Sequence, residues 1–473
     1  MNNPYDLIII GAGPGGYEAA FEAARLGLHT ALIEKDSLGG TCLNRGCIPT
    51  KTLIHTAGLH DEIRQASRFG ISSGTPVLDM QAVQRHKADT IASLQKGIAA
   101  RLKAAKIDVF YGAGTLTGIE TLPGPGNEAD LEQQSLHCVR ITAADNSITI
   151  LKARHILLAT GSMPSVPPIP GHDLPGVMTS DELLSYDGEP FESLLIIGGG
   201  VIGVEFAGIW QAFGTKVTIL EALPSLLANL DRELGQSLKL SMKKKGTDIH
   251  TGATVQSLIR TEDGICCAYL EKEQTQTVTA QAVLIATGRR PYTEGLFAEG
   301  CAPATERGRI LTDEYYETTI PGIYAIGDVV GQVQLAHAAA AQGLQAVRHI
   351  AGIPDSTAPL LIPSCVYTTP EIASVGMTLD EAKAKGIAAA SHKVLSSANG
   401  KSVLTLQERG FVKVIYVEDT HTILGAQLLC ARATDMISEF TEAIQHHLTL
   451  EDLAEVIHPH PSFSEMIAEA VRI

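Results

Sequence analysis

The chain has 473 residues, of which 36 are lysine or arginine and 52 are aspartate or glutamate, so its formal net charge is −16. This acidic balance argues against nucleic acid as a partner. Eight cysteines in so long a chain exclude a disulfide-scaffolded mini-protein. The sequence contains neither a secretory signal pattern nor an apolar run of membrane-spanning length. We therefore expect a cytoplasmic protein of about three domains that binds neither nucleic acid nor membrane.

The first predicted elements form one nucleotide-binding pattern. A buried strand at Leu7–Ile10 leads into the glycine-rich turn Gly11–Gly16, and a helix runs on to Leu26. A second strand at Thr30–Ile33 ends at Glu34. Such a turn brings free N–H groups of a helix N-terminus close to a pyrophosphate, and the acid can bind ribose hydroxyls. A glycine-rich packing turn is the alternative.

Two cysteines follow this unit, five positions apart. In an ideal helix, the Cα atoms of Cys42 and Cys47 would be separated by about 7.5 Å along the axis. A disulfide needs Cα atoms closer than about 7 Å, so a bridge requires a distorted helix, and Gly46 supplies the freedom for one. Zinc pairs usually have two to four intervening residues and a second pair elsewhere, which we do not find. The spacing favours a redox pair, with a structural disulfide as the alternative.

The nucleotide-binding pattern then repeats. A strand at Leu194–Ile197 leads into Gly198–Gly203, a helix runs to about Phe213, and Val217–Leu220 ends at Glu221. Glycines and acids of the two copies correspond at a constant offset of 187 positions, as the residue numbers show. Two copies in the same context are far more specific than one. A carboxylate at Glu221 would repel a 2′-phosphate, which favours NAD over NADP.

Three later segments read as buried strands that end in turns. His155–Gly161 and Ala282–Gly288 resemble each other and are predicted to cross between domains. Gly322–Asp328 ends in an acid that is suited to bind a cofactor. As an alternative, Asp328 is the N-cap of a helix predicted at Ala336–Ala346.

The C-terminal part has no counterpart in the repeat. Strands are predicted at Val412–Val417 and Ile423–Leu429, and a helix at Thr434–His447, which indicates a mixed α+β domain. We predict cis peptide bonds at Thr369-Pro370 and His460-Pro461. The segment 118–135, rich in glycine, proline and acids, is predicted to be a mobile loop to which we assign no function.

A His-x-His pair lies close to the end of the chain. His460, with an ordinary pKa of about 6.5, suits proton exchange near neutrality, and Glu465 could orient its ring. Alternatively, His458 and His460 form a metal pair, or they are exposed histidines in a Pro-rich tail.

Five segments, in this order, resemble one family. They are Gly-Ala-Gly-Pro-Gly-Gly-Tyr at 11–17, Gly-Gly-Thr-Cys-Leu-Asn-Arg-Gly-Cys-Ile-Pro-Thr-Lys at 39–51, Tyr-Ala-Ile-Gly-Asp-Val at 324–329, Leu-Ala-His at 335–337 and His-Pro-His-Pro-Ser-Phe-Ser-Glu at 458–465. The chain resembles the class I pyridine nucleotide-disulphide oxidoreductases over nearly its whole length. The resemblance implies an α/β fold with two Rossmann-like domains plus a C-terminal α+β dimerisation domain. The implied extents are 1–160 for FAD binding, 161–288 for NAD binding, 289–350 for a central domain that completes the FAD site, and 351–473 for dimerisation.

The resemblance also implies roles for individual residues. Cys42 would meet the substrate, Cys47 would lie nearer the flavin, and His460 with Glu465 would act as the base across a homodimer. Lys51 and Glu205 would form an ion pair near the flavin. The implied FAD-binding residues are Gly11, Gly13, Gly16, Glu34, Lys35, Gly40, Thr41, Lys51, Gly114, Thr160, Gly161, Ser162, Asp328, Gln334, Leu335, Ala336 and His337. The implied NAD-binding residues are Gly198, Gly200, Gly203, Glu205, Glu221, Val255 and Gly288, and no metal site is expected.

Within the family, the chain is most similar to members that oxidise dihydrolipoamide and reduce NAD+. The implied partners are lipoyl groups of acyltransferases or of glycine-cleavage carrier proteins. Phe21 in the first helix favours such an aliphatic substrate, whereas Glu18 resembles members that act on polyamine-conjugated disulfides. Another NAD(P)H-dependent disulfide or metal-ion reductase is the alternative enzyme. A binding function is a further alternative: the chain could dock as a peripheral subunit on a multienzyme complex. This function is compatible with catalysis.

Overall fold

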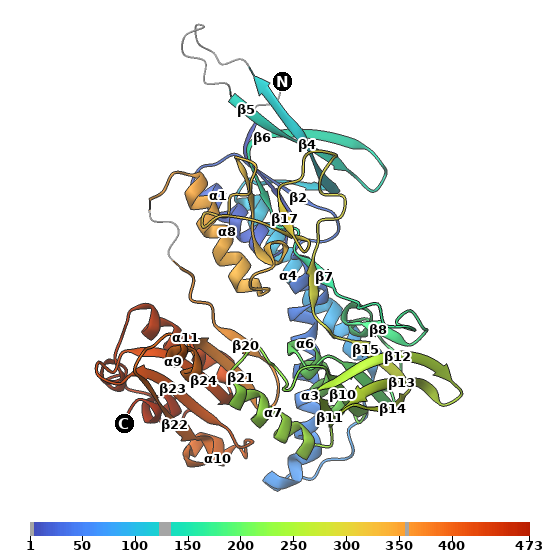
Figure 1. Ribbon diagram of the computed structural model, residues 1–473, viewed down its shortest axis with the longest axis vertical. Helices are drawn as coiled ribbons and strands as arrows, with labels where there is room; N and C mark the ends of the chain where they lie inside the picture. Colours follow the sequence, from blue (N-terminus) through green and yellow to red (C-terminus); the bar gives the residue numbers. More distant parts are fainter. Residues whose placement is uncertain (1–3, 123–133, 355–358) are drawn as a thin grey trace. The chain divides into compact units, whose positions relative to one another are not determined.

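The computed structural model describes residues 4–122, 134–354 and 359–473 (Figure 1). The chain divides into two units, each assembled from three stretches of sequence. The first unit comprises 1–49, 85–165 and 289–360, and the second comprises 50–84, 166–288 and 361–473. Each unit therefore contains one copy of the repeated nucleotide-binding pattern. Among the described helices, none is both long and apolar enough to cross a membrane.

A seven-stranded sheet forms the centre of the first unit. Its strands are β1 (Tyr5–Ile10), β2 (Thr30–Glu34), β3 (Asp108–Tyr111), β4 (Ala113–Leu122), β5 (Gln134–Thr142), β6 (Ile148–Leu158) and β19 (Ile323–Ala325). The order is β3-β2-β1-β6-β5-β4, with β19 also on β6. The pairs among β3, β2, β1, β6 and β19 are parallel, whereas β4, β5 and β6 form an antiparallel meander. Residues 7–10 of β1 are almost fully buried, as expected for a strand covered on both faces.

Helices cover this sheet, and two of them pack closely together. The helices and short elements here are α1 (Pro14–Arg25), α2 (Gly40–Arg45), α4 (Met80–Ala104), η2 (Gly327–Val330), α8 (Ala336–Ile350), β7 (Ser162–Pro164), β16 (Arg289–Pro291), β17 (Thr305–Glu306) and β18 (Arg309–Ile310). Gly15 and Gly343 let α1 and α8 approach, because a Cβ on Gly343 would lie 2.7 Å from the carbonyl oxygen of Gly15. Glu22 of α1 binds Arg25 and Arg348, and these guanidinium groups lower its pKa to about 2. The two helices are thereby fastened to each other.

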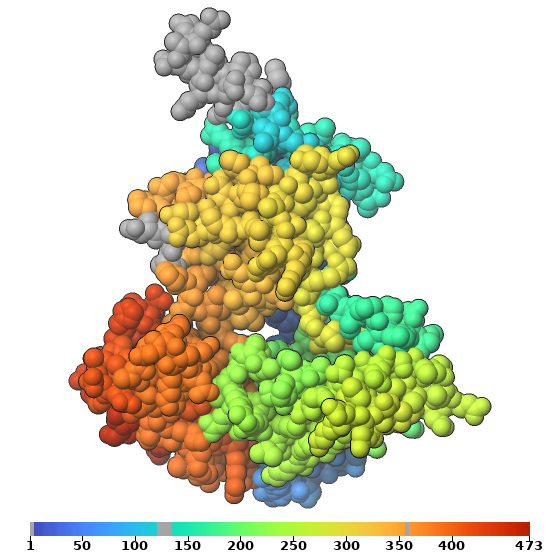
Figure 2. All heavy atoms as spheres, viewed as in Figure 1, coloured from blue at the N-terminus to red at the C-terminus, as the bar shows by residue number. Residues whose placement is uncertain are grey.

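The segment after Gly288 completes the first unit. In the space-filling view its yellow surface adjoins the cyan region of β4 and β5 (Figure 2). The N–H of Leu116 in β4 donates to the carbonyl of Leu296, and both side chains belong to one buried cluster. The separate stretches of sequence are therefore joined through a shared core.

The second unit contains a parallel sheet of five strands. Its strands are β8 (Val177–Thr179), β9 (Ser193–Ile197), β10 (Lys216–Glu221), β11 (Asp248–Thr251) and β15 (Ala282–Ile285), in the order β11-β10-β9-β15-β8. The accompanying elements are α3 (Cys47–Gln65), η1 (Ala66–Phe69), α5 (Ser180–Leu184), α6 (Val201–Ala212), α7 (Arg232–Lys244), β12 (Ala253–Thr261), β13 (Gly264–Glu271) and β14 (Gln274–Ala280). Phe206 and Trp210 of α6 are almost fully buried in the core beside this sheet.

The C-terminal part of the second unit is an antiparallel sheet with helices. Its strands are β20 (Ser364–Val366), β21 (Glu371–Gly376), β22 (Ala389–Leu395), β23 (Phe411–Val417) and β24 (Ile423–Cys430), in the order β20-β21-β24-β23-β22. The helices are α9 (Leu379–Ala384), η3 (Ser396–Ala398), α10 (Gly400–Leu404), α11 (Ala433–Gln445), α12 (Leu450–Ala454) and α13 (Glu465–Ala470). Ile437 and Phe440 of α11 pack into the core with residues of β21 and β24. The α+β character predicted for this part is confirmed.

Each strand and helix predicted from sequence is present, most of them with ends within two residues. Exceptions include β6, which begins at Ile148 and not at His155, β19, which ends at Ala325 and not at Asp328, and α8, which continues to Ile350 and does not end at Ala346. Two further predictions were wrong. Asp328 lies in η2, and α8 begins after Leu335, so the alternative of Asp328 as its N-cap was wrong. The predicted loop 118–135 was wrong at both ends, because 118–122 belong to β4 and 134–135 to β5; residues 123–133 lie outside the described residues. Backbone pairing between these strands outweighs their turn-like composition. Both predicted cis bonds, Thr369-Pro370 and His460-Pro461, are confirmed.

Two histidines of the first unit, the buried His137 and the half-buried His155, make its stability depend on pH. Burial lowers the pKa of His137 and of His155, and the buried Nδ1 atoms of both rings have no hydrogen-bond partner among the described residues. An unfolded histidine takes up a proton below about pH 6.5, whereas these folded ones resist it. The free energy of unfolding should therefore fall with pH below about 6.5, by up to about 1.4 kcal/mol per pH unit for each histidine.

Denaturant unfolding at pH 7.5 and 5.5 checks this prediction. The double variant His137→Gln, His155→Gln is expected to lose less stability between the two pH values than the unmodified protein. The exposed His86 provides the control, since His86→Gln should leave the pH dependence unchanged. Equal pH dependence in all three proteins would contradict the prediction.

Candidate active site

The two glycine-rich turns have the same closed geometry. A Cβ on Gly16 would lie 1.8 Å from the carbonyl oxygen of Gly11, and a Cβ on Gly203 would lie 2.0 Å from that of Gly198. Any side chain there would push the helix away from the strand. Helices α1 and α6 both have a glycine N-cap, Gly13 in α1, so no side chain covers their first N–H groups. The turns thus form two cradles that fit a dinucleotide pyrophosphate.

In both copies, the acid at the end of the second strand accepts hydrogen bonds from two backbone N–H groups, one of which belongs to the glycine-rich turn. Glu34 accepts hydrogen bonds from the N–H of Ala12 at 2.8 Å and from that of Asp36 at 2.9 Å. In the second unit Glu221 accepts from the N–H groups of Gly199 and Leu223. Each of these positions is shifted by the same 187 residues, so the repeat extends to individual hydrogen bonds. Both carboxylates are held at the end of their strand, where a ribose would lie.

Several predicted FAD residues of the first unit contact one another. Ser162 donates to Asp328, and Arg289 donates to Ser162 through Nε at 2.8 Å. Burial raises the pKa of Asp328, although Ser162 and Arg289 oppose this. The ammonium of Lys35 lies 3.5 Å from the centre of the Tyr292 ring. Arg289 and Tyr292 were missed from sequence, although Arg289 directly follows the predicted residue Gly288.

The other predicted residues lie at turns and element ends. In the first unit, Gly40 and Thr41 begin α2, and Gln334 to His337 lead into α8. Thr160 donates to the carbonyl of Tyr292, and Gly161 has a positive φ. Gly114 is packed against Ile10 and Ile33. In the second unit, Val255 lies at an irregularity of β12, Gly288 follows β15 with a positive φ, and a Cβ on Gly200 would meet open space. These open or glycine-lined positions fit the predicted dinucleotides.

The cysteine pair forms a disulfide where two helices meet. Helix α2 ends at Arg45, Gly46 adopts φ −146° and ψ −110°, and α3 begins at Cys47. This break brings the Cα atoms of Cys42 and Cys47 to 4.7 Å. The distorted helix predicted from the spacing is confirmed, and so is its position at Gly46.

The helix that begins at Cys47 carries the predicted ion pair one turn later. The ammonium of Lys51 donates to both carboxylate oxygens of Glu205, at 3.0 and 2.8 Å. Glu205 is only 3% exposed and also accepts from the N–H of Tyr367 at 2.9 Å. Lys51 lies 4.6 Å from the centre of the Tyr367 ring. The pair is confirmed, while Tyr367, which supports both partners, was missed because it is distant in sequence.

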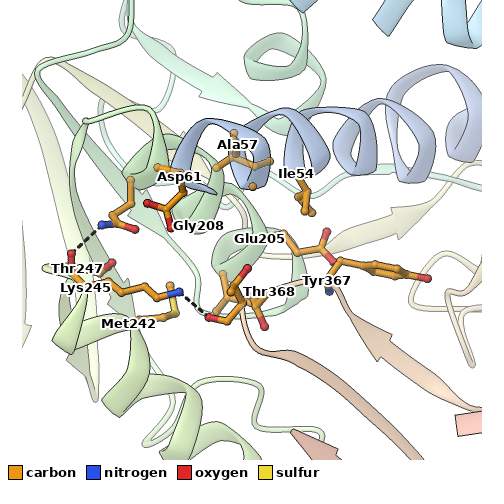
Figure 3. A pocket seen from close by; sticks show the side chains of 16 residues that line it. Ile54, Ala57, Asp61, Glu205, Gly208, Met242, Lys245, Thr247, Tyr367 and Thr368 are labelled. Atoms are coloured by element: carbon orange, nitrogen blue, oxygen red, sulfur yellow. Dashed lines mark hydrogen bonds between the residues drawn. The ribbon is translucent and has the colours of Figure 1, made fainter. Parts of the chain in front are cut away.

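A cavity of about 610 Å³, including its open mouth, borders Glu205 (Figure 3). Helices α3 and α6 supply much of its wall, including Ile54 and Gly208. Lys245 lies on another side and donates to the carbonyl of Thr369 at 2.9 Å. Burial lowers the pKa of Lys245. The buried carboxylate of Glu205 thus lies in the wall of a partly polar space.

The C-terminal histidines each bind a different acid. His460 Nδ1 is 2.8 Å from Glu465 Oε1, and the N–H of Ser462 donates to the other oxygen of Glu465 at 2.8 Å. These bonds, led by that of Ser462, lower the pKa of Glu465. The His460 side chain is 79% exposed, whereas that of His458 is 5% exposed and binds Glu439. The exposed-tail alternative is therefore wrong for His458. His460 has the geometry of a general base oriented by a carboxylate.

Comparison with known proteins adds two matches that together span most of the chain. Residues 5–343 match the family model described as pyridine nucleotide-disulphide oxidoreductase, and residues 362–471 match the dimerisation domain of that family. The chain belongs to the pyridine nucleotide-disulphide oxidoreductase family. It is therefore a flavoprotein oxidoreductase that uses FAD and NAD and acts on a sulfur group, and its dimerisation domain supports a homodimer.

Individual relatives cover nearly the whole chain. A dihydrolipoyl dehydrogenase of Bacillus subtilis is 39% identical over 99% of this chain and 98% of its own length. The crystal structure of LpdA from Mycobacterium tuberculosis has a TM-score of 0.88 at 29% identity and covers 98% of this chain and 99% of that one. The HOCl-induced flavoprotein disulfide reductase RclA of Escherichia coli has a TM-score of 0.82 at 29% identity and covers 99% of both chains.

Proposed function

We propose that this chain, as a homodimer, oxidises dihydrolipoyl groups of acyltransferases or of glycine-cleavage carrier proteins and reduces NAD+ to NADH. The observation that carries the proposal is the Cys42–Cys47 disulfide at the start of the helix that carries Lys51, beside a first nucleotide cradle. Full-length similarity to dihydrolipoyl dehydrogenases supports the choice of substrate. All eight cysteines lie in the described residues and six of them are free, which suits the reducing cytoplasm.

We propose the four domains with the extents expected from sequence: 1–160, 161–288, 289–350 and 351–473. The first unit joins most of 1–160 to 289–360, which supports the proposal that 289–350 completes the FAD site. The second unit contains 166–288 together with 361–473, which supports an NAD-binding domain packed beside the dimerisation domain.

The exchange chemistry needs only the disulfide and a base. One substrate thiolate attacks Cys42, the Cys42–Cys47 bond breaks, and Cys47 leaves as a thiolate. The second substrate thiol then attacks the mixed disulfide, so the substrate leaves as a cyclic disulfide and both cysteines are reduced. His460, oriented by Glu465, accepts a proton from the substrate thiol. In the homodimer, His460 of one subunit serves the substrate that reacts with the disulfide of the other subunit. FAD, bound by the first cradle, supplies the two-electron carrier between this dithiol and NAD+.

The first helix supports an aliphatic substrate over a cationic one. Arg101 of α4 lies 3.8 Å from the carboxylate of Glu18, and its guanidinium is 4.0 Å from the centre of the Phe21 ring. This cation already compensates the charge of Glu18, so a polyamine would have to compete with it. Phe21 is half-buried beside Arg101, and we propose that the exposed part of its ring contacts a lipoyl chain.

The Glu221→Gln variant tests the nucleotide preference. Gln keeps an oxygen acceptor for one of the two N–H groups that Glu221 binds, those of Gly199 and Leu223, and removes the charge that would repel a 2′-phosphate. We expect the unmodified protein to prefer NAD+, and the variant to lower the KM for NADP+ by about tenfold, which corresponds to about 1.4 kcal/mol. Steady-state kinetics with both nucleotides measure this. A preference of the unmodified protein for NADP+ would contradict the assignment of Glu221.

A substrate panel tests the proposed function itself. Purified holoenzyme is assayed with dihydrolipoamide and NAD+, and in the reverse direction with NADH or NADPH and lipoamide, glutathione disulfide or a polyamine-conjugated disulfide. The highest kcat/KM is expected for dihydrolipoamide with NAD+. A higher value for another disulfide would replace the proposed function by that of another disulfide reductase.

A further inference from the structure

The side chain of Asn44 ties helix α2, which carries Cys42, to the chain just before it. Its Nδ2 lies 2.9 Å from the carbonyl oxygen of Gly40, 3.1 Å from that of Leu38 and 3.4 Å from that of Ser37. An amide NH2 group has two hydrogens to donate, whereas a carbonyl oxygen can only accept. The nitrogen of the Asn44 amide must therefore face these three oxygens, and its own oxygen must point elsewhere.

The oxygen of the Asn44 amide binds a second helix. Gln95 of α4 donates to Asn44 Oδ1 through its Nε2 at 2.7 Å, and both side chains are partly buried. Because the carbonyl groups fix the orientation of the Asn44 amide, Gln95 must present its nitrogen and not its oxygen. This pair of side chains, which we call the amide clasp, thus joins α4 to α2 and to the segment before α2.

The segment that the amide clasp holds also contacts the first nucleotide cradle. The N–H of Gly39 donates to the carbonyl of Ala12 at 2.9 Å. A Cβ on Gly40 would lie 2.6 Å from the Cα of Gly13, so the two backbones are in direct contact there. Helix α2 is therefore held both to the first cradle and to α4.

Reduction of the disulfide removes the covalent link between α2 and α3. The bond between Cys42 and Cys47 breaks, and the pair gains two electrons and two protons from the dithiol that reduces it. Helix α2 has six residues, and a helix so short is not stable by itself. The residue between α2 and α3 is Gly46, and glycine restricts the backbone least. In the reduced state, non-covalent contacts of α2 must therefore keep the two sulfurs together.

The proximity of two thiols determines how stable their disulfide is. Two groups on a rigid frame meet at a high effective concentration, which falls when the chain that carries one of them becomes mobile. A lower effective concentration disfavours the disulfide relative to the dithiol, so the reduction potential rises. A contact that keeps α2 in place should therefore lower the reduction potential of the pair.

We propose that Asn44 and Gln95 are positioning residues that keep α2 in place while the Cys42–Cys47 disulfide is open, and that they thereby lower its reduction potential. The inference rests on the proposed function in one respect, because it takes this disulfide as the group that is reduced and reoxidised in each turnover. It does not depend on which dithiol reduces the pair.

Four variants of the holoenzyme test the proposal. Gln95→Leu removes the donor to Asn44 and nearly keeps the size of the side chain. Asn44→Ala removes the whole amide clasp, and the double variant shows whether Gln95 acts through Asn44. Gln81→Leu is the matched control, because it makes the same substitution at an exposed position of the same helix.

Each protein is equilibrated anaerobically with mixtures of reduced and oxidised dithiothreitol. Dithiothreitol becomes a cyclic disulfide as it gives two electrons and two protons to the cysteine pair, so the ratio of its two forms sets the potential. The thiols are then alkylated, and mass spectrometry gives the fraction of protein in which Cys42 and Cys47 remain linked.

In Gln95→Leu we expect the equilibrium constant for forming the disulfide to fall about tenfold, which for a two-electron couple raises the reduction potential by about 30 mV. Asn44→Ala should show at least the same rise, and the double variant should show no more than Asn44→Ala. Gln81→Leu should have the potential of the unmodified protein. An unchanged potential in Gln95→Leu, or an equal rise in Gln81→Leu, would overturn the proposal.

Hydrogen exchange of the backbone amides of 40–45 supplies a second measurement, for which Gln95→Leu is sufficient. In this variant, reduction of the disulfide should speed exchange in α2, whereas in the unmodified protein exchange should be similar in both redox states. Equal exchange of the reduced variant and the reduced unmodified protein would overturn the proposal. Neither measurement uses a lipoyl substrate. If the enzyme were inactive on dihydrolipoamide while the potential shifted as expected, the proposed function would fail and this inference would stand.

Discussion

The Cys47→Ser variant is expected to lose at least about 10³-fold in dihydrolipoamide–NAD+ activity while it keeps its bound FAD. Without the Cys47 sulfur no disulfide with Cys42 can form, so no electron pair can pass from the substrate dithiol to the protein. Steady-state kinetics and flavin absorbance measure the two quantities. The Cys42→Ser variant should lose activity equally, because Cys42 is the sulfur that we propose the substrate attacks.

Free cysteine Cys138, in the same unit, provides the matched control. Cys138→Ser should retain full activity. The two site variants should also differ spectroscopically. A long-wavelength absorption band is expected with Cys42→Ser, which keeps the Cys47 thiolate that we propose lies nearer the flavin, and no such band is expected with Cys47→Ser. Substantial activity in either site variant, or the band in Cys47→Ser, would refute the assignment of these cysteines.

The His460→Gln variant is expected to lower kcat/KM for dihydrolipoamide by about 10²–10⁴-fold, the range of general acid–base catalysis. Glutamine cannot accept the thiol proton at neutral pH. Glu465→Gln should have a smaller effect, because the base remains but loses the carboxylate that binds its Nδ1 at 2.8 Å. Kinetics over a pH range measure both variants.

Reactions that bypass the base supply the control for these two variants. NADH oxidation by a one-electron acceptor should continue at the unmodified rate in His460→Gln, since it needs no thiol proton transfer. If His460→Gln lost this reaction as well, the residue would be required for folding or cofactor binding instead of proton transfer.

Local patterns were predictable from sequence, and long-range contacts largely were not. The two strand–turn–helix–strand units depend on glycines and apolar periodicity within about 25 residues, so they could be recognised and their ends placed closely. The helix break at Gly46 followed from the reach of a disulfide. By contrast, the Lys51–Glu205 ion pair spans 154 positions and came only from the family resemblance.

The residues that were missed share this property. Arg289 contacts Ser162 across 127 positions, and Tyr367 contacts Glu205 across 162. No periodicity or spacing links such residues, because tertiary packing alone brings them together. The loop predicted at 118–135 was wrong at its ends for a related reason: cross-strand pairing with β5 outweighed a composition typical of turns.

The most direct test of the central claim is to follow the thiols of Cys42 and Cys47 under anaerobic conditions. Oxidised holoenzyme is mixed with one equivalent of dihydrolipoamide without NAD+, alkylated, and mapped by mass spectrometry, with reduced glutathione as the comparison. Dihydrolipoamide is expected to make Cys42 available to the reagent, and added NAD+ should restore the disulfide and form one NADH. If Cys42 and Cys47 stayed linked in the presence of dihydrolipoamide, the proposed electron path through this disulfide would be contradicted.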